Sequence, residues 1–165
     1  MNRMGHTVER VSVFCQSVSV DLQEISDRLE IEGVLVRYTR AIDAGDWDAL
    51  DSVFTPDAEI DYTESGGIAD TYPAVKAWLA EVLPAFFPRR MHSLAQVDAR
   101  LDGDTAQVTA YFHNPMPLPE PGGADGPDAT NIVEFGGLYH HTMVRTADGW
   151  RSRRLHEEIV WKRGL

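Results

Sequence analysis

The sequence predicts an α+β domain with its helices gathered on one side of a mostly antiparallel sheet. In two segments, Ile25 to Ala44 and Tyr72 to Phe87, apolar residues recur every three or four positions, as in amphipathic helices. After His92 the pattern changes to alternating apolar and polar residues, which is typical of strands. Two Asp-Gly turns in this second half indicate two long hairpins.

The first helix is predicted from an apolar stripe that faces one side. The stripe contains Ile31, Val34, Leu35, Tyr38, Ala41 and Ile42. Asp21 or Ser26 is placed to cap the start of this helix, and Gly45 is placed to end it. A second, short helix is expected from Asp46 to Phe54. A strand from Ala58 to Tyr62 follows, with Tyr62 on the same face as Ile60.

Four further strands are predicted after the helix that starts near Pro73. They run from His92 to Leu101, Thr105 to Asn114, Leu138 to Thr146 and Trp150 to Trp161. The segment from Pro115 to Asp128 is rich in proline and glycine, so we expect neither a helix nor a central strand there. It is predicted to be a long loop, either a lid or contact surface or a solvated connection between strands.

Composition narrows the class of protein. The 165 residues suffice for one domain, which we expect at 23–165 behind an N-terminal arm at 1–22. The net charge of −11 disfavours nucleic acid and anionic membranes as partners. No apolar run approaches the length of a membrane span. Cys15 is the single cysteine, so no disulfide can form within the chain, and a cytoplasmic location is expected.

Several motifs resemble those of scytalone dehydratase and its SnoaL-like relatives. They are Ala41-Ile42-Asp43-Ala44-Gly45-Asp46-Trp47, Met91-His92-Ser93-Leu94, Gly136-Gly137-Leu138-Tyr139-His140, Asp148-Gly149-Trp150-Arg151 and Val160-Trp161. The resemblance covers nearly the whole domain. It implies a cone-shaped α+β barrel of the cystatin-like, or nuclear-transport-factor-2-like, kind, with a strongly curved sheet wrapped around the long first helix. It also implies a homo-oligomer, dimer or trimer, formed through the outer sheet face.

The resemblance carries catalytic roles to Asp43, His92 and Tyr62. A second tyrosine of the pattern falls on Ile42, and Tyr38, one turn earlier, is a substitute. A second histidine of the pattern falls on Met116, with His113 three residues away, and an asparagine of the pattern falls on His140. These departures argue against scytalone itself as the substrate.

The residues support these roles on physical grounds. A carboxylate on the edge of an apolar stripe is costly unless it is paired, so Asp43 is expected to accept a hydrogen bond from His92 and orient that ring. We expect Trp78, Phe86 and Met116 to line the pocket with Tyr38. Tyr38 and Tyr62 can equally be core tyrosines with satisfied hydroxyls.

A metal site is not expected among the histidines. Neighbouring residues on a strand face opposite sides, so only one of His140 and His141 can face the pocket. The chain also lacks the motifs that hold zinc, nucleotides or a serine nucleophile. We therefore predict chemistry without metal or cofactor.

These observations predict a cofactor-independent lyase, best described as a dehydratase, that removes a proton next to a carbonyl in a hydrophobic cyclic or aromatic substrate. A ketosteroid-isomerase-like isomerase or a polyketide cyclase would use the same first step. The alternative is a non-catalytic ligand-binding or assembly module.

Overall fold

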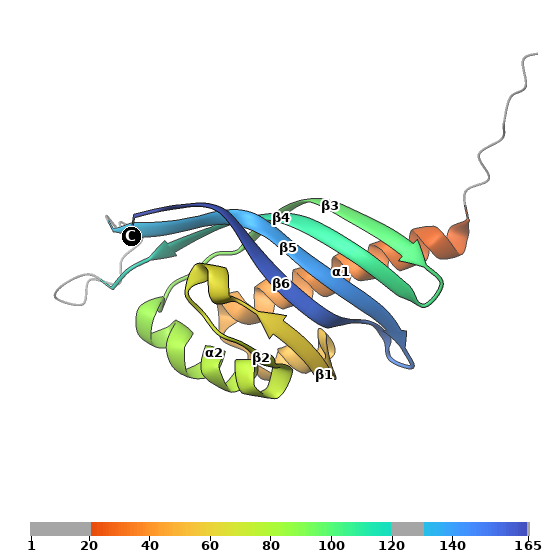
Figure 1. The fold of residues 1–165 in the computed structure, drawn as a ribbon, viewed down its shortest axis with the longest axis horizontal. Helices are drawn as coiled ribbons and strands as arrows, with labels where there is room; N and C mark the ends of the chain where they lie inside the picture. Colours follow the sequence, from red (N-terminus) through yellow and green to blue (C-terminus); the bar gives the residue numbers. More distant parts are fainter. Residues whose placement is uncertain (1–20, 120–130, 165) are drawn as a thin grey trace, which may run out of the picture.

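The computed structural model describes residues 21–119 and 131–164, and the expected arm at 1–22 lies almost wholly outside this part (Figure 1). The described part contains two helices, α1 (Leu22–Ala44) and α2 (Tyr72–Phe86), and two short 3-10 turns, η1 (Asp48–Ser52) and η2 (Thr63–Ser65). Its strands are β1 (Phe54–Asp61), β2 (Ala69–Thr71), β3 (Ser93–Asp102), β4 (Thr105–Pro117), β5 (Ile132–Thr146) and β6 (Gly149–Arg163). None of its helices is both long and apolar enough to cross a membrane.

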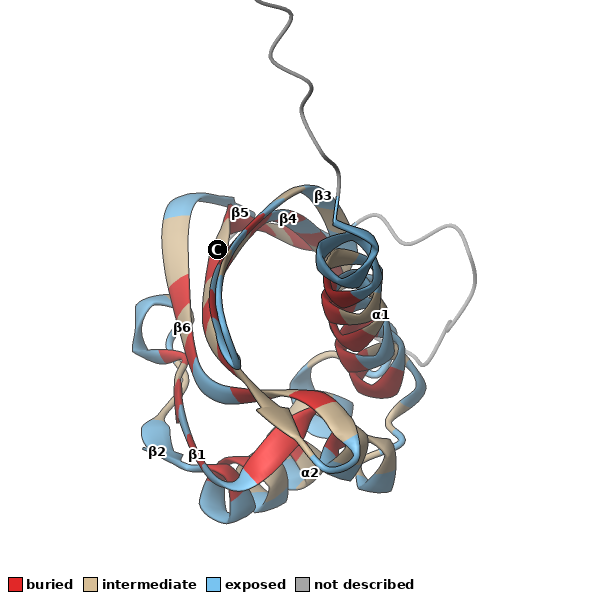
Figure 2. Cartoon of the chain, turned by 90° about the vertical axis from the view of Figure 1, so that its right-hand side faces the viewer, coloured by how far each residue is buried: buried red, intermediate tan, exposed pale blue. Residues whose placement is uncertain are grey.

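All six described strands form one sheet in the order β2-β1-β6-β5-β4-β3. The β1–β6 pair is parallel and the other pairs are antiparallel. The sheet is strongly curled but not closed, and α1 lies along its concave side (Figure 2). The predicted α+β class with a mostly antiparallel, curved sheet is therefore confirmed.

Local signals set the ends of α1. The Asp21 carboxylate accepts a hydrogen bond of 2.9 Å from the Gln23 amide, which satisfies one of the free N–H groups of the first turn. Gly45 ends the helix in the left-handed conformation at φ 68°, which costs glycine little. The buried stripe of α1 faces the sheet and its other side faces solvent, as Figure 2 shows.

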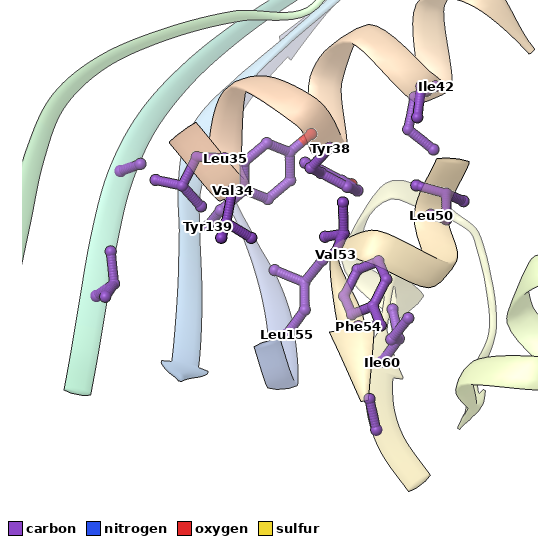
Figure 3. Close-up of a cluster of buried hydrophobic side chains, with 14 of the residues drawn as sticks. Val34, Leu35, Tyr38, Ile42, Leu50, Val53, Phe54, Ile60, Tyr139 and Leu155 are labelled. Carbon is purple, nitrogen blue, oxygen red and sulfur yellow. The ribbon is translucent and has the colours of Figure 1, made fainter. Parts of the chain in front are cut away.

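The core lies between α1 and the inner face of the sheet. Figure 3 shows side chains from α1, β1, β5 and β6 meeting there, including Leu35, Tyr38, Phe54, Tyr139 and Leu155. Each of these residues is at most 2% exposed, so the helix and both halves of the sheet share one apolar interior.

An ion pair between a buried carboxylate and a partly exposed guanidinium connects the first turns of α1 to the β5–β6 hairpin. Asp27, 5% exposed, accepts hydrogen bonds of 2.8 Å and 2.6 Å from the Arg145 guanidinium and one of 3.1 Å from the indole of Trp150. These donors, led by Arg145, hold the pKa of Asp27 well below its usual range. The charge is thus stabilised where the sequence pattern alone would place an apolar residue.

The proline-rich segment differs from expectation at its start. Pro115 and Pro117 lie in β4 and pair with Glu134 and Ile132 of β5, so the prediction that the loop starts at Pro115 was wrong. The reason is that β3 begins at Ser93, opposite His113, which leaves the last residues of β4 at a sheet edge. There the missing N–H of proline breaks no hydrogen bond between strands. The rest of the predicted loop, from 120 onward, lies outside the described residues.

Candidate active site

A cavity of about 260 Å³ lies between α2, the C-terminal half of α1 and the inner face of the sheet. Its apolar wall comes mainly from α2 and the residue after it: Trp78, Leu79, Val82, Leu83, Phe86 and Phe87. Polar side chains gather elsewhere in the lining: Tyr38, Tyr62, Ser65, Asn114, Tyr139 and Glu157. An apolar pocket with a few convergent polar groups is the usual form of a small-molecule site, and this volume suits a small ligand.

Asp43 and His92 meet at the wall of this cavity. The ring Nδ1 of His92 lies 2.6 Å from Asp43 Oδ1, and the backbone N–H of His92 donates to Asp43 Oδ2 at 3.0 Å. Both oxygens of the carboxylate are therefore engaged by one residue. The His92 side chain is 6% exposed and lines the cavity, whereas Asp43 lies behind it and is 28% exposed.

Arg90 fixes the chain segment that carries His92. Its guanidinium donates to the Ile42 carbonyl at 2.5 Å, near the end of α1, and to the Phe87 carbonyl at 3.0 Å, at the end of α2. The same group lies over the Trp47 ring at 5.5 Å, within the range of a cation–π contact. These contacts bring the start of β3 against the last turn of α1, where Asp43 is located.

Three tyrosines form a buried polar group within the cavity lining. The hydroxyls of Tyr38 and Tyr62 are 2.7 Å apart, and the Asn114 side-chain amide donates to the Tyr139 hydroxyl at 2.8 Å. Burial is the main cause that raises the pKa of Tyr38, Tyr62 and Tyr139 well above the usual range. These phenols therefore stay protonated and act as hydrogen-bond donors.

Glu157 is the one carboxylic side chain in the cavity lining formed by the described residues. It is 6% exposed and contacts the hydroxyls of Ser65 and Tyr139. Burial raises its pKa from 4.5 to about 7, and this effect exceeds the opposing effects of the Ser65 and Tyr139 hydroxyls and of His156. A proton-holding carboxyl group is thus present in the same cavity as the imidazole of His92.

The structure brings most of the predicted site residues together. Tyr38, Tyr62, Trp78, Phe86, His92 and Met116 all line the cavity. Phe86 is 62% exposed as well, which places it at the rim. Asp43 reaches the cavity only through His92.

His113 and His140 are not brought into the cavity. His113 is 51% exposed on its side chain and contacts Glu134 at 2.8 Å, and His140 contacts Glu158 at 2.7 Å. Three residues separate His113 from Met116, and an odd spacing on a strand puts them on opposite faces. The same alternation turns His140 outward, between the buried Tyr139 and His141. His141 is buried but does not line the cavity either.

Three further polar residues line the cavity and were not predicted from the sequence: Asn114, Tyr139 and Glu157. Each sits in the inward register of its strand: Asn114 follows Phe112 by two residues, and Glu157 follows Leu155 by two. A polar residue that replaces an apolar one in an alternating pattern was the available signal. No group of three metal-ligating side chains occurs among residues 21–119 and 131–164.

Comparison with known sequences identifies one family. The pattern described as "SnoaL-like domain" matches residues 23–156. The uncharacterized protein Rv2910c of Mycobacterium tuberculosis (strain ATCC 25618 / H37Rv) is 45% identical over 135 residues, which cover 82% of this chain and 86% of the relative.

Three solved structures show the same fold. A candidate aromatic ring hydroxylase from Novosphingobium aromaticivorans is 28% identical, with a TM-score of 0.73, and covers 86% of this chain and 94% of its own. A candidate scytalone dehydratase from the same species is 18% identical, with a TM-score of 0.72, over 86% and 89% of the two chains. A hexachlorocyclohexane dehydrochlorinase, LinA type 2, is 16% identical, with a TM-score of 0.74, over 88% and 93%.

Proposed function

The chain belongs to the SnoaL-like domain family, and from that premise we propose that it is a cofactor-independent lyase, best described as a dehydratase. Its substrate would be a hydrophobic cyclic or aromatic compound with a hydroxyl group β to a carbonyl. Two solved structures of the same fold are named as a candidate scytalone dehydratase and a hexachlorocyclohexane dehydrochlorinase. Both names denote elimination reactions, which supports this class of reaction.

The observation that carries the proposal is the contact between Asp43 and His92 at the cavity wall. Because the carboxylate occupies Nδ1, Nε2 is the ring nitrogen that remains to take a proton from a bound substrate. The second carboxylate contact, to the His92 backbone, holds the residue in this orientation. The negative charge of Asp43 stabilises the imidazolium that forms.

The tyrosines supply the complementary group. Removing a proton next to a carbonyl places negative charge on the carbonyl oxygen. The paired hydroxyls of Tyr38 and Tyr62 are fixed donors inside an apolar cavity, where a hydrogen bond to a developing charge is worth more than in water. The apolar wall from α2, with Trp78 and Phe86, would bind the ring system and keep water out.

Two reactions test the proposal. 3-Hydroxy-1-tetralone, a bicyclic β-hydroxyketone, loses water to form 1-naphthol, which is followed by absorbance. 1-Tetralone has no leaving hydroxyl, and proton NMR in D2O reports exchange of its hydrogens next to the carbonyl. The second reaction needs only the proton-abstraction step that lyases, isomerases and cyclases share.

We expect wild-type protein to accelerate both reactions. His92→Ala should lower both rates by about 10²- to 10⁴-fold, which is the usual contribution of a general base. Asp43→Asn should lower both rates as well, with little change in ligand affinity, because the carboxylate acts through His92. His113→Ala is the matched control, since that histidine lies outside the cavity, and it should leave both rates unchanged.

Failure of the wild-type protein to exchange or dehydrate would favour the non-catalytic binding module. Rates that survive both His92→Ala and Asp43→Asn would remove the catalytic roles of this pair.

A further inference from the structure

The mechanism above leaves one buried acid of the cavity unused. Glu157 lies on β6, in the inward register next to Leu155, and its cross-strand neighbour on β5 is Tyr139. Both Glu157 and His92 line the same cavity, although 65 residues of sequence separate them. A carboxyl group at such a position is costly unless it has a function or a partner that offsets the loss of water.

The surroundings of Glu157 favour its neutral, protonated form. Burial is the largest cause that raises the pKa of this carboxyl group, and its hydrogen bonds with the uncharged hydroxyls of Ser65 and Tyr139 lower the pKa by less. Its Oε2 atom has no hydrogen-bond partner among the described residues. Glu64 repels a second negative charge, and His156 lies on the outward face of the same strand, where it contacts Asp61 and Glu64.

The other polar groups of the lining are poor sources of a proton. The phenols of Tyr38, Tyr62 and Tyr139 hold their protons far above neutral pH. The amide of Asn114 donates hydrogen bonds but does not ionise. His113 and His140, which the sequence offered as second acids, lie outside the cavity. Among the described lining residues, Glu157 is therefore the acid that accompanies His92.

We propose that Glu157 is the general acid of this site, which gives its proton to the departing hydroxyl while His92 removes the proton from carbon. This inference rests on the dehydratase function proposed above. The carbon–hydrogen electron pair forms the new double bond, the carbon–oxygen bond breaks, and the hydroxyl leaves as water. His92 ends protonated and Glu157 ends ionised, and both return to the starting state by proton exchange with solvent.

If Glu157 is the acid, the dehydration rate depends on pH in a predictable direction. Because the pKa of Glu157 is raised to about 7 by burial, the acid form is present below this pH and is lost above it. Dehydration should therefore fall as pH rises through about 7. The titratable groups around it are Tyr139 on β5, Tyr38 on α1, Tyr62 just before η2, Glu64 within η2, His156 on β6 and His92 in the lining of the same cavity.

Glu157→Gln separates the two proton transfers. Glutamine has the same shape and can donate a hydrogen bond, but it cannot give up a proton. We expect this variant to keep the exchange of 1-tetralone hydrogens and to lose dehydration of 3-hydroxy-1-tetralone by about 10²- to 10⁴-fold. Glu158→Gln is the matched control: the next residue of β6, it is 45% exposed on its side chain and contacts His140, and it should change neither reaction.

The two proposals fail in different ways. If wild-type protein exchanges 1-tetralone but Glu157→Gln dehydrates at the wild-type rate, Glu157 is not the acid and the proposed function stands. If wild-type protein catalyses neither reaction, the proposed function itself is lost, and with it the acid role.

A second measurement tests the acid without turnover. ¹³C-NMR of glutamate side-chain carboxyl carbons, assigned with Glu157→Gln, should show Glu157 titrating near pH 7. The His92→Ala variant is expected to bind 3-hydroxy-1-tetralone without converting it. In this variant the bound ligand should raise the titration midpoint of Glu157, since a hydroxyl oxygen accepts a hydrogen bond only from the protonated acid. A Glu157 carboxyl that titrates in the ordinary acidic range, or whose midpoint the ligand leaves unchanged, would overturn the proposal.

Discussion

His141 is an imidazole that the fold keeps uncharged. It is 2% exposed and packs near the rings of Tyr38 and Tyr139. Its Nδ1 lies 2.9 Å from the Ser152 hydroxyl, which itself donates to the Arg154 carbonyl, so the hydroxyl oxygen accepts from Nδ1–H. Nε2 has no partner among the described residues. A second proton would find no acceptor there.

The free energy of unfolding should depend on pH because of His141. Burial lowers the pKa of His141 from 6.5 to about 3, so between these values the unfolded chain binds a proton that the folded protein does not. Its contribution to stability is complete above about pH 6.5 and is lost as pH falls toward 3. We expect the free energy of unfolding to drop by roughly 3 kcal/mol between pH 7 and pH 4 from this residue.

Urea unfolding at both pH values checks this expectation. His141→Gln should reduce the drop, whatever its effect on stability at pH 7, because the titrating group is gone. His113→Gln, at an exposed position, should keep the wild-type dependence. An unchanged drop in His141→Gln would show that other groups cause the acid sensitivity.

The pair Gly136-Gly137 lets β5 and β6 stay in contact across an irregular register. The pairing shifts between these two glycines, where Gly136 lies opposite Trp161 and Gly137 opposite Ile159. A Cβ on Gly136 would overlap the Trp161 ring, and one on Gly137 would overlap the Glu158 carbonyl oxygen. The close approach therefore needs residues without side chains.

Gly137→Ala should destabilise the protein by about 1–3 kcal/mol, the usual cost of forcing extra volume into a packed region. Gly33→Ala is the control, since its Cβ would meet only the Arg37 side chain, at 3.6 Å. Alanine is a better helix former than glycine by about 1 kcal/mol, so this change in α1 should raise the melting temperature. Thermal unfolding of both variants compares them directly, and a neutral Gly137→Ala would mean that the backbone of Glu158 can move away.

Neither described helix covers the outer face of the sheet. Tyr111 on β4 and Val160 and Trp161 on β6 are 50%, 61% and 44% exposed. Exposed apolar side chains that gather on one face are typical of surfaces that bind another protein. The homo-oligomer expected from the family resemblance, a dimer or trimer through this face, stays a prediction.

Sedimentation velocity tests this prediction. Wild-type protein should sediment as a dimer or trimer, and Tyr111→Asp should shift it toward the monomer, because a buried unpaired charge is costly. Leu29→Asp is the control, an exposed apolar residue on the solvent side of α1, and should leave the assembly intact. A monomeric wild-type protein would contradict the expectation.

Local rules were enough for much of the fold. The capping by Asp21, the left-handed Gly45 and the Asp-Gly turn at Gly149, with φ 96°, act within a few residues and were readable in the chain. The family resemblance added the positions of Asp43 and His92. Predicted strands were too short where pairing continued past local signals, as in β5, which begins at Ile132 rather than Leu138.

Sequence patterns predicted both long helices, most of the strands and the apolar face of each, because those properties depend on neighbours a few residues away. The short β2 and the start of β5 were missed. The packing of distant segments brings Glu157 and His92 to one cavity and leaves His113 and His140 outside it. The physical reason is that desolvation and strand register depend on what packs from distant segments. The same carboxyl group would stay an ordinary acid on the other face of β6.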